Sequence, residues 1–227
     1  MPIFLLGEEP VFPPAELADK DGIIAVGGDL SAERLLNAYA RGIFTWYSEE
    51  DPIIWWSPDP RLVLFPDELH VSGSMKKLLK KKPFQLTCDQ AFEQVIKKCR
   101  RPGRSSEETW ITGEMLDAYI RLHNLGFAHS VEAWQQEKLV AGFYGIALGK
   151  TFFGESMFFE VTNASKFAFI KFVKKLFELG YLMIDCQVPT KHLQSLGARE
   201  IARANFILIL KESLKHKTNV GKWDLTF

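Results

Sequence analysis

The chain has 227 residues, of which 47% are hydrophobic and 25% are charged, as in an ordinary globular protein. Its 28 basic residues balance its 28 acidic ones, so a basic field over the whole molecule is excluded and any contact with nucleic acid must come from a local patch. The three cysteines form no CxxC pair, which argues against a disulfide framework or a structural zinc site. No run of about 18 apolar residues is present, and the first residues lack the basic region of a signal peptide, so we expect a cytosolic protein without a membrane span.

Residues 1–61 are predicted to form a small N-terminal α/β domain. Residues 1–30 are rich in Pro, Gly and Asp and end in a turn. Ser31 is a good N-cap for a helix that Gly42 would end. The aromatic segment that follows carries three prolines, which exclude a long regular element. We therefore expect an aromatic loop folded over a surface or cleft, with a domain boundary near Arg61.

Residues 62–227 are predicted to form a second domain of strands and helices. Apolar spacing first favours a strand at 62–65, a basic helix at 72–82, a helix beginning near Asp89 and a helix from Thr112 to Gly126. Three consecutive strands should follow at 129–136, 138–148 and 151–159. A long helix then begins at Asn163 or Ser165, ends at Gly180, and is expected to bury Phe167, Ile170, Val173 and Phe177. The last expected elements are a buried strand at 181–188, a short helix and turn at 192–198, and a helix at 205–214.

This order of elements, a hairpin followed by strand, helix, strand and helix, resembles the core of acetyltransferases of the GNAT type. We therefore expect an α+β fold, in which a GNAT-like mixed-sheet domain follows the small first domain. In the GNAT fold a glycine-rich turn at a helix N-terminus binds the pyrophosphate of coenzyme A. The corresponding segment, GESMFFEVTNASK at 154–166, has no such run of glycines. We accordingly expect the scaffold without the coenzyme site, and no cofactor.

Seven short strings in one order make the resemblance specific. They are GIIAVGGDLSAERLLNAYARGIFTWY, WWSPDPR, TWIT, GESMF, NASK, IDCQV and SLGA, and they run from Gly22 to Ala198. Together they are similar to the leucyl/phenylalanyl-tRNA–protein transferase family. The resemblance implies an enzyme that moves Leu or Phe, and less well Met, from aminoacyl-tRNA to proteins beginning with Arg or Lys, which marks those proteins for degradation. It implies two partners, the charged tRNA and the acceptor protein, and we expect a cytoplasmic monomer with no membrane partner.

The implied reaction is the aminolysis of an ester, which needs two positioned substrates, a neutral amine and a stabilised oxyanion. By the resemblance, Asp185 and Gln187 lie at the catalytic centre, and on a strand such positions face the same side. We expect Gln187 to hydrogen-bond the attacking amine, while Asp185 could orient Gln187, attract the acceptor cation or take the proton. The matching second acid, Glu155, would bind the acceptor's Arg or Lys. The plainer alternatives are that the pair caps nearby backbone and that Glu155 forms a surface ion pair.

Apolar and aromatic residues are expected to bind the donor. By the resemblance, the pocket for the transferred side chain is lined by Phe143, Phe152, Phe172, Leu176 and Ile184. Three aromatic residues would lie near the terminal adenosine of the tRNA, where a ring can stack on a base: Tyr39, Trp46 and Trp110. For each pocket residue taken alone, plain core packing is the competing interpretation.

The densest charge cluster is a candidate contact for the tRNA backbone. It comprises Lys76, Lys77, Lys80, Lys81 and Lys82. Like charges stacked at helical spacing destabilise a helix, so a phosphate partner would explain them, and a solvated basic face is the alternative. The five histidines form no HxxxH pair, and we expect no metal. Two other functions stay open from the sequence: a GNAT-type acetyltransferase and a non-catalytic tRNA-binding module.

Overall fold

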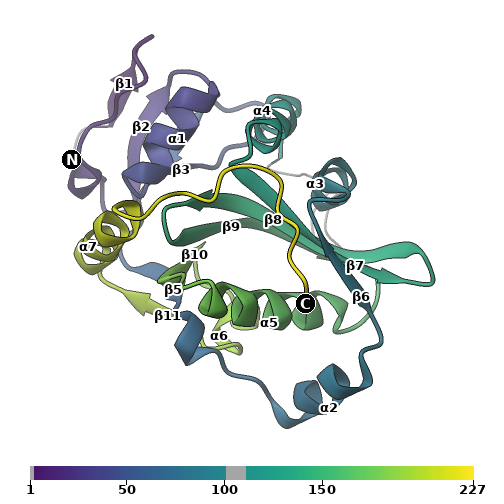
Figure 1. Cartoon of the computed structure of the whole chain (residues 1–227). Coiled ribbons are helices and arrows are strands. Elements are labelled where there is room, and N and C mark those ends of the chain that lie inside the picture. The colour runs from purple at the N-terminus through teal and green to yellow at the C-terminus, as the bar shows by residue number, and fades with distance from the viewer. Residues whose placement is uncertain (1–2, 101–110) are drawn as a thin grey trace.

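The computed structural model of the chain describes residues 3–100 and 111–227 and contains two sheets (Figure 1). The smaller sheet has the strand order β1-β2-β4-β3. Its strands are β1 (Phe4–Leu6), β2 (Ile23–Gly27), β3 (Phe44–Thr45) and β4 (Ile54–Trp56). The expectation that the aromatic segment is an irregular loop was wrong in this respect, because β3 precedes its first proline, Pro52, and β4 fits between Pro52 and Pro58.

Helix α1 (Ala32–Ala40) packs beside this sheet and begins and ends as predicted. The Ser31 side chain accepts a hydrogen bond from the backbone N–H of Arg34. Gly42 follows the helix with a φ of 74°, and a Cβ atom there would lie 2.7 Å from the side chains of Phe206 and Ile207. A glycine is therefore required both for the left-handed turn and for the close approach of the C-terminal helix.

The larger sheet is mixed and has the strand order β11-β5-β10-β9-β8-β7-β6. Its strands are β5 (Arg61–Leu64), β6 (Gln85–Cys88), β7 (Ala128–Gln135), β8 (Lys138–Leu148), β9 (Thr151–Phe159), β10 (Met183–Gln187) and β11 (Arg199–Ile201). Strands β9 and β10 are parallel, and the other neighbours in this sheet are antiparallel. The expected α+β class with a mixed sheet in the second part is confirmed. Strands β6 and β11 were not predicted, since both are short edge strands without an apolar run.

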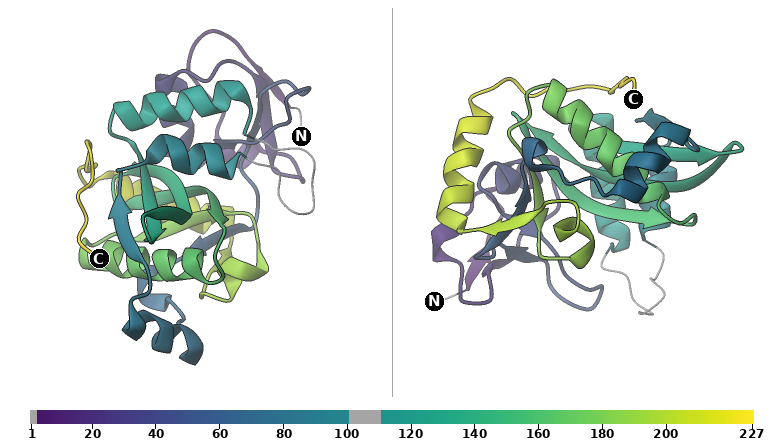
Figure 2. Two further views of the ribbon diagram at one scale, coloured as in Figure 1. Left: turned by 90° about the vertical axis from the view of Figure 1, so that its right-hand side faces the viewer. Right: turned by 90° about the horizontal axis from the view of Figure 1, so that it is seen from below.

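Helices cover both faces of the larger sheet. They are α2 (Gly73–Lys81), α3 (Phe92–Cys99), α4 (Gly113–Asn124), α5 (Ala164–Glu178), α6 (Lys191–Gln194) and α7 (Arg203–Leu214), with short 3-10 turns at Ala15–Leu17 and Pro66–Glu68. Figure 2 shows α3 and α4 on one face, α5 on the other, and α2 projecting from the body. One apolar core lies between the sheet and α3, α4 and α1, and a second lies under α5.

Helix α5 buries Phe167, Ile170 and Val173 as predicted, but Phe177 is 57% exposed. In the last turn the neighbouring Leu176 faces the sheet instead. The prediction for Phe177 was wrong because the buried position in the last turn is Leu176, three residues after Val173.

The smaller sheet and the larger one share a core. The buried cluster that contains Trp55 and Leu35 also contains Val95 and Tyr119. The division into domains at residue 61 stays a prediction. The strands of the smaller sheet all precede this residue, and the first strand of the larger sheet begins at it.

Candidate active site

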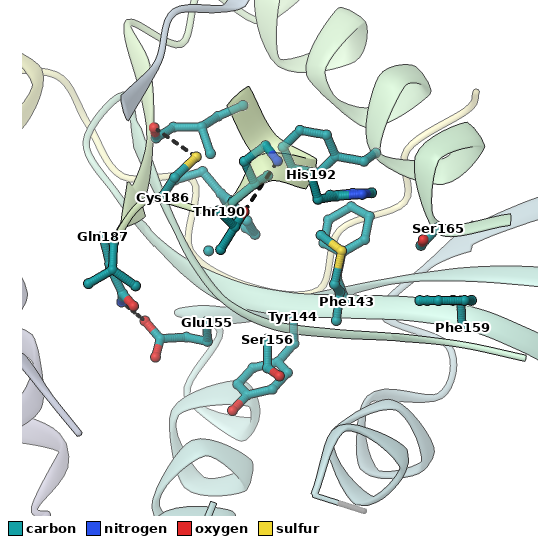
Figure 3. A pocket seen from close by; sticks show the side chains of 17 residues that line it. Phe143, Tyr144, Glu155, Ser156, Phe159, Ser165, Cys186, Gln187, Thr190 and His192 are labelled. Atoms are coloured by element: carbon teal, nitrogen blue, oxygen red, sulfur yellow. Dashed lines mark hydrogen bonds between the residues drawn. The ribbon is translucent and has the colours of Figure 1, made fainter. Parts of the chain in front are cut away.

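A cavity of about 440 Å³ lies between the larger sheet, α5 and α6. Of the residues expected to line the donor pocket, Phe143, Phe152 and Ile184 do so. Other apolar lining residues are Met157, Phe159, Phe169, Cys186, Val188 and Leu193. Polar groups gather at the edges: Glu155, Ser156, Ser165, Gln187, Thr190 and His192 (Figure 3).

Phe172 and Leu176 do not line this cavity, which corrects the expectation. Both are fully buried, and the ring of Phe172 packs edge-on against Phe143 at 5.2 Å and Phe152 at 4.8 Å between centroids. The cavity lies against the first half of α5, where Phe169 faces it, one turn before Phe172. Phe172 therefore supports two lining rings from behind.

Asp185 is buried in an ion pair with Arg61. Its Oδ1 accepts a hydrogen bond from Arg61 Nε at 2.8 Å, and its Oδ2 accepts one from the terminal nitrogen Nη2 at 2.6 Å. The guanidinium lies between the rings of Phe44 and Phe206, 4.7 Å from each centroid. A carboxylate held at both oxygens by a guanidinium is fixed in place and already has its cationic partner.

Gln187 has a φ of 62°, a conformation that non-glycine residues adopt at a cost of about 1–3 kcal/mol. Its backbone N–H donates to Asp185 Oδ1 at 2.9 Å, and its side-chain Nε2 donates to Glu155 Oε1 at 3.0 Å. The register of β10 against β5 shifts between Asp185 and Gln187. Asp185 therefore fixes the backbone that aims Gln187 at Glu155. Figure 3 shows the hydrogen bond between Gln187 and Glu155.

Glu155 on β9 is the centre of a hydrogen-bond cluster. Tyr39 from α1 donates to its Oε1 at 2.7 Å, and Tyr119 from α4 donates to its Oε2 at 2.9 Å. The two tyrosine hydroxyls also lie 2.7 Å from each other. Burial raises the pKa of Glu155 to about 7, and the charge of Asp185 adds to the rise while the hydrogen bonds from the tyrosines and Gln187 oppose it.

The aromatic residues expected near the adenosine have different surroundings. Tyr39 is 1% exposed, so its ring is not open to stacking in this structure, and its place near the adenosine stays a prediction. Trp46 is 43% exposed and borders a smaller space of about 110 Å³. That space is also lined by Phe44, Thr45, Glu155, Gln187 and Val188. Trp110 lies outside the described residues.

The predicted lysine cluster lies on the projecting helix α2 and its end. Lys76, Lys77, Lys80, Lys81 and Lys82 are all exposed. Within residues 3–100 and 111–227 none of these side chains forms an ion pair with a carboxylate. The charge of α2 is therefore not neutralised by the described part of the chain.

Sequence reasoning missed three participants in the site. Arg61 was treated only as a boundary residue, Tyr119 was given no role in the site, and His192 was one of five histidines to which no role was assigned. The first two could not be recognised locally, because their partners lie 124 and 36 residues away. Figure 3 shows the His192 ring projecting from α6 into the cavity.

Neither a metal centre nor a membrane segment is found in the part of the chain that the structure describes. Among these residues no group of three or more His, Cys, Asp or Glu side chains could hold a metal ion. No helix within them has both the length and the apolar character required to cross a membrane.

Comparison with known proteins places the chain in a family. A family model described as leucyl/phenylalanyl-tRNA protein transferase matches residues 63–211, and the model of that protein's N-terminal domain matches residues 28–59. The chain belongs to the leucyl/phenylalanyl-tRNA–protein transferase family. It is thus an enzyme, an aminoacyltransferase, as the resemblance in its motifs indicated.

Curated members of the family match over nearly their full lengths. The leucyl/phenylalanyl-tRNA–protein transferase of Syntrophobacter fumaroxidans is 54% identical over 99% of this chain and 96% of its own length. That of Pseudomonas fluorescens is 57% identical over 93% of this chain and 94% of its own length. That of Anaeromyxobacter sp. strain K is 53% identical over 99% of this chain and 97% of its own length.

Solved structures resemble the transferase more distantly. L-PGS from Bacillus licheniformis has a TM-score of 0.42 at 12% identity and covers 74% of this chain and 53% of its own. A GCN5-related N-acetyltransferase from Kribbella flavida has a TM-score of 0.39 at 9% identity and covers 74% of this chain and 60% of its own. At these scores neither structure bears on what this chain does.

Proposed function

We propose that the enzyme transfers Leu or Phe, and less well Met, from aminoacyl-tRNA to the α-amine of acceptor proteins that begin with Arg or Lys. The new peptide bond would mark those proteins for degradation, and the enzyme would act as a monomer in the cytoplasm. The observation that carries the proposal is one apolar cavity with Glu155 and Gln187 at its edge, beside a second space against Trp46.

The cavity suits an apolar side chain that has no branch at Cβ. Its volume of about 440 Å³ lies within the range of small-ligand sites, roughly 300–1,000 Å³. Aromatic rings from β8, β9 and α5 form its walls: Phe143, Phe152 and Phe169. Leu, Phe and Met would each bury their side chains there by the hydrophobic effect.

The polar edge of the cavity suits the ester carbonyl and the attacking amine. Gln187 reaches this edge, and its amide can hydrogen-bond an amine without taking up a proton. Asp185 is already paired with Arg61, so of the roles left open for it we favour the orientation of Gln187. Glu155 stays the acceptor-binding residue of the proposal, but its partner is the α-amine of the acceptor. A carboxyl with a pKa of about 7 is not permanently ionised, so it is poorly suited to pair with an Arg or Lys side chain.

The tRNA would approach from the side of the smaller sheet. Trp46 borders both that sheet and the space next to Glu155, so a terminal adenine stacked on its ring would bring the 3′ ester to the cavity. Further along the tRNA, the lysines of α2 would meet phosphates.

The deciding experiment uses the full chain with Leu-tRNA and a peptide that begins with Arg. The product expected is the same peptide extended by one N-terminal Leu, without added ATP or coenzyme, because the ester is already activated. A peptide beginning with Glu is the control and should not be extended. Modification of the Arg peptide from acetyl-CoA, or tight binding of tRNA without transfer, would contradict the proposal.

A further inference from the structure

Three short oxygen contacts around Glu155 form a closed triangle. Its sides are Tyr39 hydroxyl to Glu155 Oε1 at 2.7 Å, Tyr119 hydroxyl to Glu155 Oε2 at 2.9 Å, and hydroxyl to hydroxyl at 2.7 Å. Each distance is typical of an O–H···O hydrogen bond. Two oxygens 2.7 Å apart with no hydrogen between them would repel each other, because their lone pairs would face each other. Each side of the triangle therefore requires one proton.

The triangle needs three protons, and the two tyrosines supply only two. Each phenol has a single O–H, and an ionised carboxylate has none. If Glu155 is ionised and both tyrosines donate to it, the contact between Tyr39 and Tyr119 has no proton. If one tyrosine donates to the other, one carboxylate contact has none. A neutral Glu155 supplies the missing proton, because its own O–H provides the third hydrogen bond.

The neighbouring amide indicates where the third proton lies. Gln187 Nε2 donates to Oε1, so Oε1 is favoured as the carbonyl oxygen of the acid and Oε2 as its hydroxyl. Tyr119 donates to Oε2 when the carboxyl is ionised, and that contact reverses when the carboxyl is neutral. In the neutral arrangement Glu155 donates to Tyr119, Tyr119 donates to Tyr39, and Tyr39 donates back to Oε1. The ring then has a single direction in which all three hydrogen bonds are satisfied.

We infer that Glu155 is the proton carrier of the transfer reaction, resting as a neutral acid in a ring with Tyr39 and Tyr119. This inference rests on the proposed function and deepens it. Glu155 would be a catalytic residue, while Tyr39 and Tyr119 would be positioning residues that act through it. Both tyrosines keep their own protons, because burial raises the pKa of each well above its ordinary value.

The proton balance of aminolysis fits a single group that first donates a proton and then accepts one. The neutral amine attacks the ester carbonyl, and a C–N bond forms. As the C–O bond breaks, Glu155 gives its proton to the departing ribose 3′ oxygen, which leaves as a hydroxyl. The peptide nitrogen still carries one proton in excess, and it returns that proton to Glu155. While Glu155 is ionised, both tyrosines can donate to it, as they do to a carboxylate in hydrogen-bonded sites.

Few charged or titratable groups face Glu155, and each belongs to a helix or strand described above. Asp185 on β10 disfavours ionisation, and its own charge is paired with Arg61 on β5. Tyr144 on β8 and the two ring tyrosines on α1 and α4 stay neutral, since burial raises their pKa values. No lysine or arginine lies within ion-pair distance of Glu155 in residues 3–100 and 111–227.

The protonation state can be measured without any substrate. In protein labelled with ¹³C at the glutamate carboxyl, the Glu155 signal is the one that disappears in the Glu155→Gln variant. We expect that signal to show a neutral acid at pH 6 and to change to a carboxylate as the pH rises through about 7. A carboxylate signal already present at pH 6 would overturn the inference, whether or not the enzyme transfers Leu.

The chemical role is tested by single-turnover transfer from Leu-tRNA to an Arg-starting peptide. Glu155→Gln keeps the ring, because its amide oxygen can accept from Tyr39 and its amide nitrogen can donate to Tyr119, but it has no proton to give. We expect normal folding and tRNA binding with transfer lowered by about 10²–10⁴-fold. Transfer within a few-fold of the wild type would refute the proton role and leave the proposed function intact. A wild type that does not transfer at all would refute the proposed function instead.

The pH profile of the wild type covers the case in which a variant does not fold. Deprotonation of the acceptor amine raises the rate, and loss of the Glu155 proton lowers it. Because the pKa of the acid, about 7, lies below the roughly 7.7–8.0 of an α-amine, we expect a bell whose rising limb ends near pH 7 and whose falling limb begins near pH 8. Tyr39→Phe and Tyr119→Phe should each move the limb near pH 7, which reports Glu155. Tyr181→Phe is the matched control, since that buried hydroxyl has no hydrogen-bond partner in the described chain. A rate that keeps rising through pH 8.5, or a limb that no tyrosine change moves, would contradict the ring.

Discussion

Asp185 Oδ1 accepts hydrogen bonds from two residues at once, Arg61 Nε at 2.8 Å and the backbone N–H of Gln187 at 2.9 Å. One carboxylate thus ties the start of β5 to the end of β10, where Gln187 leaves the regular strand. The ion pair is fully buried, so its two halves depend on each other: either alone would be an uncompensated charge in the core.

Removing one half of this pair should destabilise the protein strongly. For Asp185→Asn and for Arg61→Met we expect the free energy of unfolding to fall by about 3–5 kcal/mol, because the other group stays buried and charged. The double variant Arg61→Met with Asp185→Asn should lose less than the sum of the single changes. Urea unfolding of the four proteins tests this. Additive losses, or single losses below about 1 kcal/mol, would show that water reaches the pair.

The acid at position 155 should make stability depend on pH. Its pKa is raised from 4.5 in the unfolded chain to about 7 in the fold. Its contribution is therefore fully present below pH 4.5 and is lost as the pH rises to about 7, by up to about 3 kcal/mol. Glu155→Gln lacks this loss, so it should gain stability relative to the wild type between pH 5 and pH 8. Unfolding curves at both pH values measure the difference, with the exposed Glu50→Gln as control. An equal difference at pH 5 and pH 8 is the contrary result.

The lysines of α2 should act on tRNA affinity and on its salt dependence. Changing Lys76, Lys80 and Lys81 to Gln should weaken binding of every tRNA alike. The slope of log affinity against log salt should fall by about 0.7–0.9 for each phosphate that the protein no longer neutralises. The control changes three exposed lysines elsewhere, namely Lys20, Lys138 and Lys217. An unchanged slope, or the same change in the control, would mean that α2 is only a solvated surface.

The aromatic walls of the cavity should select the transferred side chain by shape near Cβ. Leu and Phe branch beyond Cβ, whereas Ile and Val are wide and stiff at Cβ. The loss of a methylene explains only about 1–3 kcal/mol against Val, so a larger penalty shared by Ile and Val would come from a clash. Transfer rates from tRNAs charged with Leu, Ile and Val onto one Arg-starting peptide decide this. An Ile rate close to the Leu rate would leave simple hydrophobic sorting as the explanation.

Local chemistry predicted the regular elements well. The Ser31 cap, the glycine after α1, and the three long strands β7, β8 and β9 all follow from short-range patterns and are present. What local patterns could not give is pairing across the chain. Tyr39 shares the apolar helix face with Leu35, and only the fold shows that its hydroxyl meets a carboxyl 116 residues away. The three-residue strand β1 escaped prediction for the same reason, since it is held by its parallel pairing with β2. Strand β2 has the apolar residues of a strand and was missed because glycines and aspartates flank it.

The site residues divide along the same line. The resemblance brought Glu155 and Gln187 forward by motif, and the structure places them in contact. The resemblance could not show which of the two carboxyls, Asp185 or Glu155, has no cationic partner. That depends on Arg61, whose pairing with Asp185 is seen only in the folded structure. Phe172 and Leu176 were assigned to the cavity because apolar residues of one helix look alike in a sequence. Their place behind the wall follows from where along α5 the cavity ends.

Tyr39 lies before residue 61 and Glu155 after it, so the ring of hydroxyls and carboxyl joins the two parts of the gene at the reacting centre. A recombinant that takes its first 60 residues from one relative and the remainder from another would have to rebuild that ring to within a fraction of an ångström. An exchange of one part alone therefore succeeds only where both relatives place these hydroxyls and this carboxyl alike. The boundary that looks like a natural seam in the sequence divides the reacting centre.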